Sequence, residues 1–326
     1  MYLGSFAACG LWVGRVHPGT GELTVTGAVP DVAQASFLAC ALDRRTLYTT
    51  NELSPDGTVT ALDLADPARP VPRNRQPTGG AAPTHLSVHT SGRFLLTANY
   101  GDPSVAVHRL EPDGAIGECT DRAGLDGHAH QVLTDPSGRW VLAVDLGADT
   151  VHVYRLNPAD GTLTARDRLR LQPGFGPRHL AFHPYGRFLY ILGELRPEIA
   201  VAGWDAATGR LDAGPVLATA AAGDTFPAEL TVCRDGRFVY ATNRGENTVA
   251  VLGTRDDGAG LVPVGAAPTG GDWPRHLALG PDERWLYVCN QRSGTVTQLP
   301  RDPTTGLPGA PVRAVPVPDV AVLLFH

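Results

Sequence analysis

One pattern recurs along most of the chain, and it limits the folds that are open to it. Each copy contains a short apolar stretch, a tight turn, an arginine and a second apolar stretch, as in HLAFHPYGRFLYILGEL at residues 179–195. The copies are about 46 to 50 residues apart, counted between the arginines after the turn, which are Arg45, Arg93, Arg139, Arg187, Arg237 and Arg284. Repeats of this length are typical of folds built from stacked units.

Each copy continues with signals for two more strands. A stretch of alternating residues follows, as at 150–154 (TVHVY), and then a Gly/Asp turn and a weaker strand, as at 160–164 (DGTLT). Four antiparallel strands in about 45 residues indicate a β-propeller blade. One blade cannot bury both of its faces, so the blades are expected to pack radially around an axis.

Six complete copies leave one piece at each end of the chain. Residues 2–6, 11–17 and 22–28 supply a second, third and fourth strand, and residues 320–325 supply a first strand. Together these pieces make one more blade, closed by pairing of the N- and C-terminal strands, which removes exposed sheet edges. The sequence therefore predicts an all-β fold, a seven-bladed β-propeller, as a single domain over residues 1–326.

Composition excludes several classes of protein. Hydrophobic residues make up 43% of the chain, so a large core can form. All 27 basic residues are arginines, the formal net charge is -6 and no basic run occurs, so nucleic acid is not an expected partner. The five cysteines are scattered without a CxxC pair, which argues against a disulfide framework. No leader and no apolar run of about 20 residues is present, so we expect no membrane association, a cytoplasmic location and a monomer or weak homo-oligomer.

Comparison of the copies separates structural positions from candidate site positions. In a propeller blade the first strand lies innermost, and its start lies on the same rim as the end of the second strand. The column six residues after the arginine is nearly constant, with Asn51, Asn99, Asp145, Gly193, Asn243 and Asn290. This near-constancy predicts a structural role, in which the Asx side chain satisfies backbone amides at the turn.

Three other columns vary between copies and are mostly polar. Seven residues after the arginine stand Glu52, Tyr100, Leu146, Glu194, Arg244 and Gln291, with Phe6 in the split blade. Nine residues before it stand Ser36, Thr84, His130, Arg178, Ala228 and Arg275. Eight residues before it stand Phe37, His85, Gln131, His179, Glu229 and His276, where the repeated histidines favour an interblade hydrogen bond. Solvated loop residues are the alternative, but polar groups that converge on a concave centre are typical of a binding pocket.

Metal binding is not predicted. His128 and His130 are the only close pair of histidines, and no HExxH-type motif occurs. His89 and His183 fall at the opposite rim, and His108 and His152 in third strands, so these four are interpreted as structural. We expect neither a metal nor another cofactor.

The candidate residues favour chemistry on a small anion. Arg178, Arg244 and Arg275 suit bidentate pairing with carboxylate or phosphate. An imidazole or carboxylate beside them suits proton transfer near neutral pH. No GxSxG, GxGxxG or P-loop motif points elsewhere. Addition of water to, or proton transfer on, a small anionic substrate fits this set best.

Five strings of the chain resemble the seven-bladed propeller lactonases, a family that includes 6-phosphogluconolactonases and the fungal 3-carboxy-cis,cis-muconate lactonizing enzymes. They are PTHLSVHTSGRFLLTANYG, HAHQVLTDPSGRWVLAVDLGAD, GPRHLAFHPYGRFLYILGEL, AELTVCRDGRFVYATNRG and WPRHLALGPDERWLYVCNQ. The resemblance covers essentially the whole chain and implies lactone chemistry without a metal. Matched motif by motif, it implies catalytic roles for His130, Arg178, Glu194 and Arg244.

The rim where the innermost strands begin surrounds one opening of the central channel, which is called the mouth. The other residues expected there are candidates for substrate binding, namely Glu52, Tyr100, His128, His179, Glu229, Arg275, His276 and Gln291. Two positions depart from the family pattern, since Gly193 and His276 stand where relatives often have Asn. An additional imidazole at the mouth bears on the choice of substrate.

Three functions are compatible with these residues. The first is a lactonase that hydrolyses a small anionic lactone of the sugar-acid type, with 6-phosphogluconolactone as a candidate. The second is a cyclase or cycloisomerase that closes a lactone from an unsaturated carboxylic acid, because a proton donor and an anion clamp serve both directions. The third is a non-catalytic propeller that binds a protein partner, against which the charged, convergent mouth argues.

Overall fold

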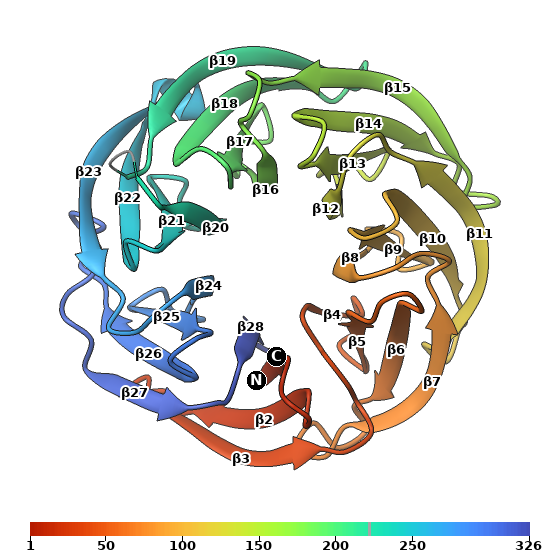
Figure 1. Ribbon diagram of the computed structural model, residues 1–326, viewed down its shortest axis with the longest axis horizontal. Helices are drawn as coiled ribbons and strands as arrows, with labels where there is room; N and C mark the ends of the chain where they lie inside the picture. The colour runs from red at the N-terminus through yellow and green to blue at the C-terminus, as the bar shows by residue number, and fades with distance from the viewer. Residues whose placement is uncertain (221–222) are drawn as a thin grey trace.

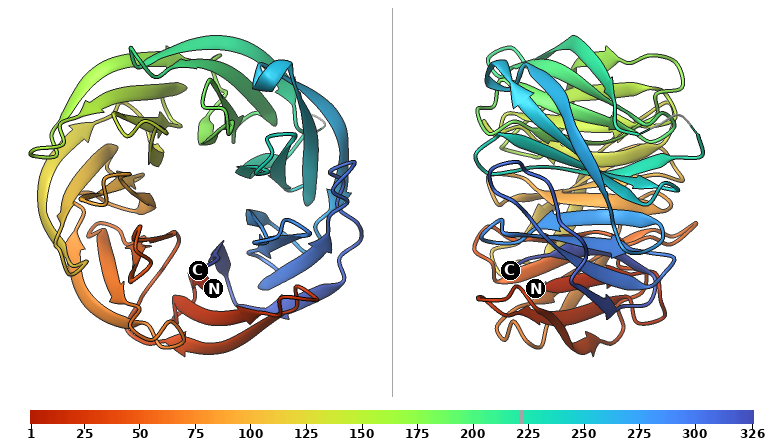
Figure 2. Two further views of the ribbon diagram at one scale, coloured as in Figure 1. Left: turned by 180° about the vertical axis from the view of Figure 1, so that it is seen from behind. Right: turned by 90° about the vertical axis from the view of Figure 1, so that its left-hand side faces the viewer.

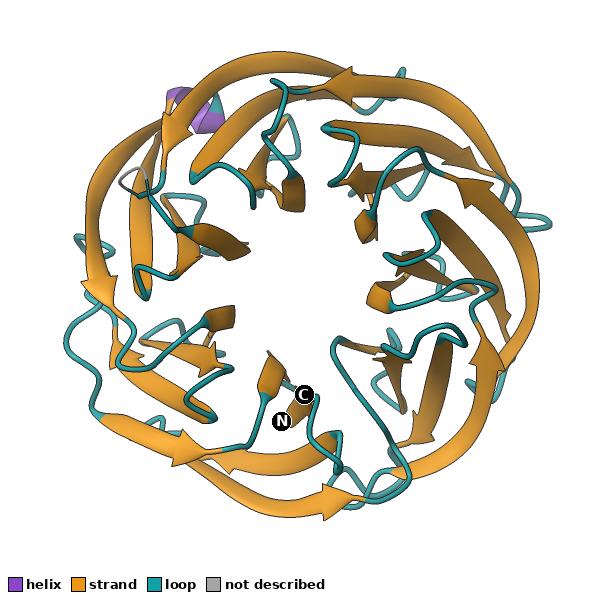
Figure 3. Cartoon of the chain, viewed as in Figure 1, coloured by secondary structure: helices purple, strands orange, loops and turns teal. Residues whose placement is uncertain are grey.

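The strands form a ring of sheets around one axis. The computed structural model describes residues 1–220 and 223–326, and it contains seven sheets of four strands (Figure 1). The only helical element within these residues is a short 3-10 turn, η1 (Asp256–Gly258), at the outside of the ring (Figure 3). The predicted seven-bladed β-propeller is confirmed.

Each sheet is one blade, in which the first strand lies nearest the axis and the last strand lies outermost. Blade 1 contains β4 (Leu38–Cys40), β5 (Thr46–Asn51), β6 (Thr58–Asp63) and β7 (Val71–Pro77). Blade 2 contains β8 (Pro83–Val88), β9 (Phe94–Asn99), β10 (Ser104–Leu110) and β11 (Ile116–Gly124). Blade 3 contains β12 (Ala129–Thr134), β13 (Trp140–Asp145), β14 (Thr150–Leu156) and β15 (Leu163–Arg170).

The second half of the ring repeats this order. Blade 4 contains β16 (Pro177–Phe182), β17 (Phe188–Gly193), β18 (Glu198–Asp205) and β19 (Arg210–Ala218). Blade 5 contains β20 (Phe226–Val232), β21 (Phe238–Arg244), β22 (Thr248–Arg255) and β23 (Gly260–Pro268). Blade 6 contains β24 (Pro274–Leu279), β25 (Trp285–Asn290), β26 (Thr295–Pro300) and β27 (Arg313–Pro316).

Blade 7 closes the ring with both ends of the chain. It contains β28 (Val320–Leu324), β1 (Tyr2–Ser5), β2 (Leu11–Val16) and β3 (Leu23–Val29). The last strand pairs antiparallel with the first, so Tyr2 lies opposite Leu324. The two termini consequently lie side by side near the axis (Figure 2). The predicted split blade is confirmed.

Apolar side chains fill the spaces between neighbouring blades. One cluster joins blades 3 and 4 and includes Trp140, Leu142, Phe175 and Leu189. In addition, five buried tyrosine hydroxyls donate to a backbone carbonyl oxygen of the next blade, from Tyr2 to Pro67, Tyr48 to Gly114, Tyr190 to Gly258, Tyr240 to Gly306 and Tyr287 to Gly21. Burial of a large apolar side chain contributes about 1.5–3 kcal/mol, and the hydroxyl bonds add a directional contact between blades.

The two rims of the ring carry different connections. The innermost strand of each blade begins at one rim, called the start rim, and ends at a tight turn on the other, called the turn rim. Where the turn lacks a glycine, Arg44 and Glu283 adopt the left-handed conformation themselves, with φ of 59° and 56°. At the turn rim His89 bonds the carbonyl oxygen of Gly138 in the next blade, at 3.0 Å. His183 bonds that of Gly236 in the same way, which confirms their structural role.

Two further sequence expectations concern the whole chain. Within the described residues, no helix has the length and apolarity that a bilayer crossing requires. All five cysteines are free thiols, as their scattered positions predicted.

Removal of residues 319–326 deletes β28, and we expect the truncated chain to unfold or aggregate. The reason is that β1 becomes an open edge and the buried contacts of Val320 and Leu323 are lost. Thermal melting by circular dichroism and size-exclusion chromatography measure the effect. Removal of His326 alone is the control, because it leaves β28 intact. An unchanged melting temperature in the longer deletion would contradict a stabilising role for the closure.

Candidate functional site

An irregularity in the innermost strands directs consecutive side chains towards the axis. The strand register shifts across Ala129/Gln131 in β12, Pro177/His179 in β16 and Pro274/His276 in β24, and β8 and β20 have the same feature. A regular strand points successive side chains to opposite faces, whereas a β-bulge places two residues against one partner. The two consecutive residues at each bulge therefore turn inwards together.

These residues line a small axial cavity of about 10 Å³, which is room for one water molecule. Its walls are Ser36, Phe37, Thr84, His130, Arg178, His179, Glu229, Arg275, His276 and Ala321. Members of both columns before the arginine anchor thus lie around one cavity, although Ala228, His85 and Gln131 do not line it.

Glu194 lies between two buried guanidinium groups at the start rim. Its Oε1 is 2.7 Å from Arg244 Nη2, and its Oε2 is 3.1 Å from Arg178 Nε in an ion pair without hydrogen-bond geometry. Arg178 Nη1 also donates to the carbonyl oxygen of Ala228, and Arg244 Nε donates to that of Phe226 at 2.9 Å. The three charged side chains come from blades 4 and 5 and are held rigidly.

The charges of this cluster follow from its surroundings. Burial raises the pKa of Glu194, but the Coulomb attraction of Arg244 and Arg178 outweighs it and holds the pKa below its usual value. Burial lowers the pKa of Arg178 to about 9, with Arg244 adding to the effect, so this guanidinium stays charged at neutral pH. Glu194 is therefore an ionised counter-charge and a poor proton acceptor.

His130 is buried beside this cluster and keeps an unpaired nitrogen. Only 5% of the residue is exposed, and its Nδ1 has no hydrogen-bond partner in the part of the chain that the structure describes. Burial lowers its pKa well below the usual value, and Arg178 adds to this effect by charge repulsion. Its ring centre is 5.2 Å from that of His179 and 6.0 Å from that of Tyr100. His130 is thus a neutral imidazole that can accept a proton.

Glu229 joins two further imidazoles at the axis. Its Oε1 is 2.9 Å from Nδ1 of His179, and its Oε2 is 3.3 Å from Nε2 of His276. Burial raises the pKa of Glu229, although His276 counteracts this. Gln131 accepts a hydrogen bond from the backbone of Leu180 in the next blade, at 2.7 Å. Of the histidines in this column, His179 makes the predicted interblade hydrogen bond, whereas Nδ1 of His85 and Nδ1 of His276 have no partner among the described residues. His179, Glu229 and His276 also line the cavity.

The remaining candidates lie around the mouth. Glu52 Oε2 is 3.9 Å from Arg275 Nη2, and burial raises the pKa of Glu52. Tyr100 stacks on the exposed ring of His128, with ring centres 4.3 Å apart. Gln291 lies at the end of β25, and its side chain makes no hydrogen bond to the other candidates within residues 1–220 and 223–326. The structure thus brings together every predicted candidate except Gln291.

The constant Asx column is structural, although its chemistry differs from the expectation. Asp145 accepts hydrogen bonds from the backbone N–H groups of Gly127 and His128, as predicted. The asparagines instead donate, as in the 2.7 Å bond from Asn51 Nδ2 to the carbonyl oxygen of Ala33. The prediction of backbone amide capping was wrong for them, because the amide NH2 group supplies donors that a carboxylate lacks.

Sequence comparison missed two residues at the mouth, Trp273 and Arg292. The guanidinium of Arg292 lies 3.4 Å from the centre of the Trp273 indole, and that of Arg244 lies 5.2 Å from the same centre. Arg292 stands eight residues after the anchor Arg284, one column beyond those compared. Trp273 stands directly before the innermost strand of blade 6. Comparison of one more column after those used, and of two more before them, would therefore have included both residues.

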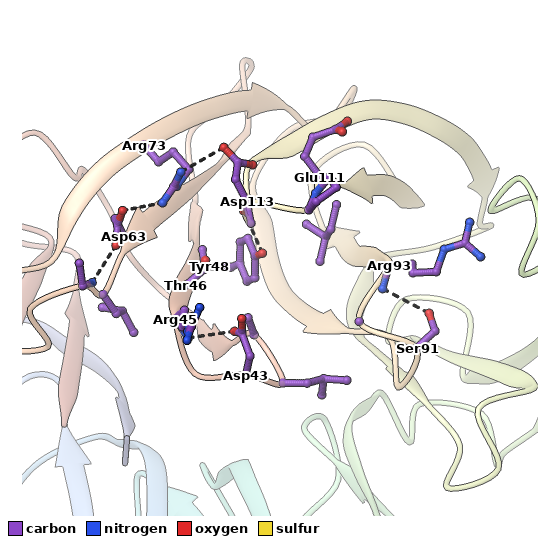
Figure 4. A pocket seen from close by; sticks show the side chains of 18 residues that line it. Asp43, Arg45, Thr46, Tyr48, Asp63, Arg73, Ser91, Arg93, Glu111 and Asp113 are labelled. Carbon is purple, nitrogen blue, oxygen red and sulfur yellow. Dashed lines mark hydrogen bonds and ion pairs between the residues drawn. The ribbon is translucent and has the colours of Figure 1, made fainter.

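The larger grooves lie at the turn rim. One of about 920 Å³ lies between blades 1 and 2, where Arg73 pairs with Asp63 at 2.5 Å and with Asp113 at 3.1 Å (Figure 4). Its opposite charges satisfy each other. A second groove, of about 560 Å³, shares Phe37, Glu229 and His276 with the axial cavity. Histidine, cysteine and acidic side chains of the described residues form no metal-binding group of three or more.

The chain is thus a seven-bladed propeller with a cluster of buried arginine, glutamate and histidine side chains at its axis. A family model described as "Lactonase, 7-bladed beta-propeller" matches residues 1–325. The chain therefore belongs to the seven-bladed β-propeller lactonase family, as its motifs indicated. The prediction of a hydrolase of the lactonase type is confirmed with it.

Three similar proteins illustrate this membership. The chain is 30% identical over 308 residues to the 6-phosphogluconolactonase of Bacillus subtilis. This match covers 89% of this chain and 87% of that protein. It is 31% identical over 292 residues to the 6-phosphogluconolactonase of Pectobacterium carotovorum, at 88% and 86% coverage. The structure of the periplasmic gluconolactonase PpgL of Pseudomonas aeruginosa superposes with a TM-score of 0.92 at 30% identity, covering 98% of this chain and 97% of that one.

Replacement of Glu194 by Gln should lower the free energy of unfolding by roughly 3 kcal/mol at neutral pH, because Arg178 and Arg244 then lie buried without a counter-charge. The pKa of Glu194 is lowered in the folded chain from its ordinary 4.5. Its contribution is therefore present above pH 4.5 and is lost as the pH falls through the lowered value.

Urea unfolding of both proteins at neutral and acidic pH measures this difference, which should shrink on acidification. Glu118→Gln is the control, because it removes a carboxylate whose side chain is 76% exposed. A difference that stays constant with pH would contradict the ionised state of Glu194.

Proposed function

We propose that the chain is a one-domain lactonase, spanning residues 1–326, that hydrolyses a small anionic lactone of the sugar-acid type. The observation that carries this proposal is the pair of guanidiniums on Glu194 beside the neutral imidazole of His130. The names of the relatives in Bacillus subtilis and Pectobacterium carotovorum make 6-phosphogluconolactone the first substrate to test. Cytoplasmic location and a monomeric or weakly oligomeric state stay predictions from the sequence.

The two arginines supply the anion site. Arg178 Nη1 and Arg244 Nε donate hydrogen bonds to backbone carbonyl oxygens, while Arg178 Nε and Arg244 Nη2 face Glu194 in ion pairs. This leaves Arg178 Nη2 and Arg244 Nη1 without a protein partner among the described residues. Preorganised donors of this kind stabilise the oxyanion that forms when water adds to a carbonyl group. Glu194 keeps both guanidiniums oriented and offsets their mutual repulsion.

His130 is the proposed general base. It takes a proton from water as the water oxygen bonds to the lactone carbonyl carbon. When the ring C–O bond breaks, the same imidazole returns the proton to the leaving alkoxide. The products are a hydroxyl group and a carboxylic acid, which releases its proton to solvent. Glu194 is less suited to this role, because both of its oxygens face guanidiniums, whereas Nδ1 of His130 has no partner among the described residues.

The other candidates are proposed to bind the substrate from around the mouth. Glu52 and Arg275 form one side, and Tyr100 with His128 forms an aromatic wall beside His130. His179, Glu229 and His276 form the floor, and their mutual bonds hold it in place. Gln291 is retained as a candidate on its position alone.

A hydrolysis assay tests the proposal directly. Purified enzyme treated with chelator is given 6-phosphogluconolactone, unphosphorylated δ-lactones and an unsaturated diacid, and products are identified by mass spectrometry. We expect hydrolysis of a lactone. Replacement of Arg178 or His130 by Ala should lower kcat/KM by about 100-fold or more. The exposed Arg187, at the turn rim, provides the control variant Arg187→Ala. Ring closure of the diacid without lactone hydrolysis would favour the cyclase instead.

The pH dependence tests the role of His130. The neutral imidazole is the active form, so the rate is lost as the pH falls through the lowered pKa of His130. We expect kcat/KM to be constant through neutral pH, with an acid limb clearly below 6.5, the ordinary value for histidine. An acid limb at or above 6.5 would show that a different group is the base.

A further inference from the structure

Arg292, at the start rim, differs from the arginines of the axial cluster in its surroundings. Arg178 and Arg244 share Glu194, Arg275 lies near Glu52, and Arg196 lies 3.8 Å from Glu198. Arg292 is exposed and forms no ion pair within residues 1–220 and 223–326. Its guanidinium lies 3.4 Å from the centre of the Trp273 indole. This group is therefore oriented by stacking, while its N–H edge remains free for a ligand.

Stacking prepares the guanidinium for an oxyanion. A planar guanidinium carries its donors in its plane, so contact of one face with an indole leaves those donors available. Phosphate accepts two parallel N–H bonds from such a group, and holding the side chain in advance reduces the entropy that binding would lose. A lysine at this position would lack both the plane and the fork.

Trp273 is itself held in an uncommon conformation. Its φ is 65°, in the left-handed region that L side chains of this kind rarely adopt. Two hydrogen bonds keep it there, since its N–H donates to Asn247 Oδ1 and its carbonyl oxygen accepts from the N–H of Gln291, both at 2.9 Å. Strain of this sort persists where the surroundings enforce it and often accompanies function. The position of the indole is thus fixed by the rim.

The same indole connects Arg292 to the catalytic cluster. Arg244 lies 5.2 Å from its centre, so the two guanidiniums are separated by little more than this one side chain. A sugar-acid lactone phosphate has the reacting carbonyl in the ring and the phosphate on a carbon outside it. Such a molecule carries negative charge at two places, on the phosphate and on the carbonyl oxygen as water adds to it. The mouth has a guanidinium near each of two such positions, Arg292 and Arg244.

We propose that Arg292, held against Trp273, binds the phosphate of a phosphorylated sugar-acid lactone whose carbonyl lies at Arg178 and Arg244. This proposal rests on the proposed lactonase function and adds to it the residue that selects phosphorylated over unphosphorylated substrates.

Replacement of Arg292 by Ala should raise KM for 6-phosphogluconolactone about 10- to 100-fold, as loss of a bond to a charged group implies. It should leave kcat, and both parameters for unphosphorylated gluconolactone, within about twofold, because no contact to the reacting carbonyl changes. Arg292→Lys should recover only part of the affinity. The control is Arg170→Ala, which removes an equal charge from an exposed position at the start rim of blade 3.

A binding measurement separates this proposal from the lactonase function. Titration calorimetry compares 6-phosphogluconate with gluconate on the wild type, Arg292→Ala and Arg170→Ala, and it needs no turnover. A preference for the phosphorylated acid that disappears only in Arg292→Ala supports the proposal, even if no lactone is hydrolysed. A preference that survives in Arg292→Ala, or a wild type without any preference, overturns it while leaving lactone hydrolysis untouched.

Discussion

The pairing of β28 with β1 closes the ring of blades whose side chains form the candidate site. Arg178 and Glu194 come from blade 4 and Arg244 from blade 5, and His130 comes from blade 3. Blade 4 separates blades 3 and 5 in the ring. Blades 4 and 5 pack directly against each other, with Leu192 and Leu230 in one buried cluster, and the strand pair in blade 7 joins the two ends of the ring to which they belong.

The bulges in the innermost strands give the mouth its density of polar groups. With regular alternation, a strand of six residues such as β16 would direct Arg178 and His179 to opposite faces. The register shift lets both line one cavity. Because the side chains around this cavity are buried, the pKa of each ionisable group depends on the charged groups beside it. Glu194, between two guanidiniums, has a lowered pKa, whereas Glu229, facing imidazoles, has a raised one. The pKa values of two carboxyl groups of the same type are therefore shifted in opposite directions by their surroundings.

The repeat predicted the number of blades and the split blade, because strand period and turn spacing are local properties. Variation between equivalent positions also selected His130, Arg178, Glu194 and Arg244 as candidates, and the structure shows them near one another. The repeat could not show that Glu194 bonds both arginines, since pairing depends on side-chain geometry across blades. The bulges, and the donor role of Asn51, depend on backbone detail that composition does not encode.

The absence of lysine gives this mouth its persistent positive charge. A buried lysine loses its proton readily, whereas the guanidinium of Arg178 stays protonated at neutral pH even with its pKa lowered to about 9. Burial raises the pKa of Glu52 and Glu229, the other two carboxyl groups beside these arginines. The chain carries a net charge of -6, yet the axis concentrates cations where the field lines converge. This local concentration of cations supports the proposed anionic substrate, because it opposes the charge of the molecule as a whole.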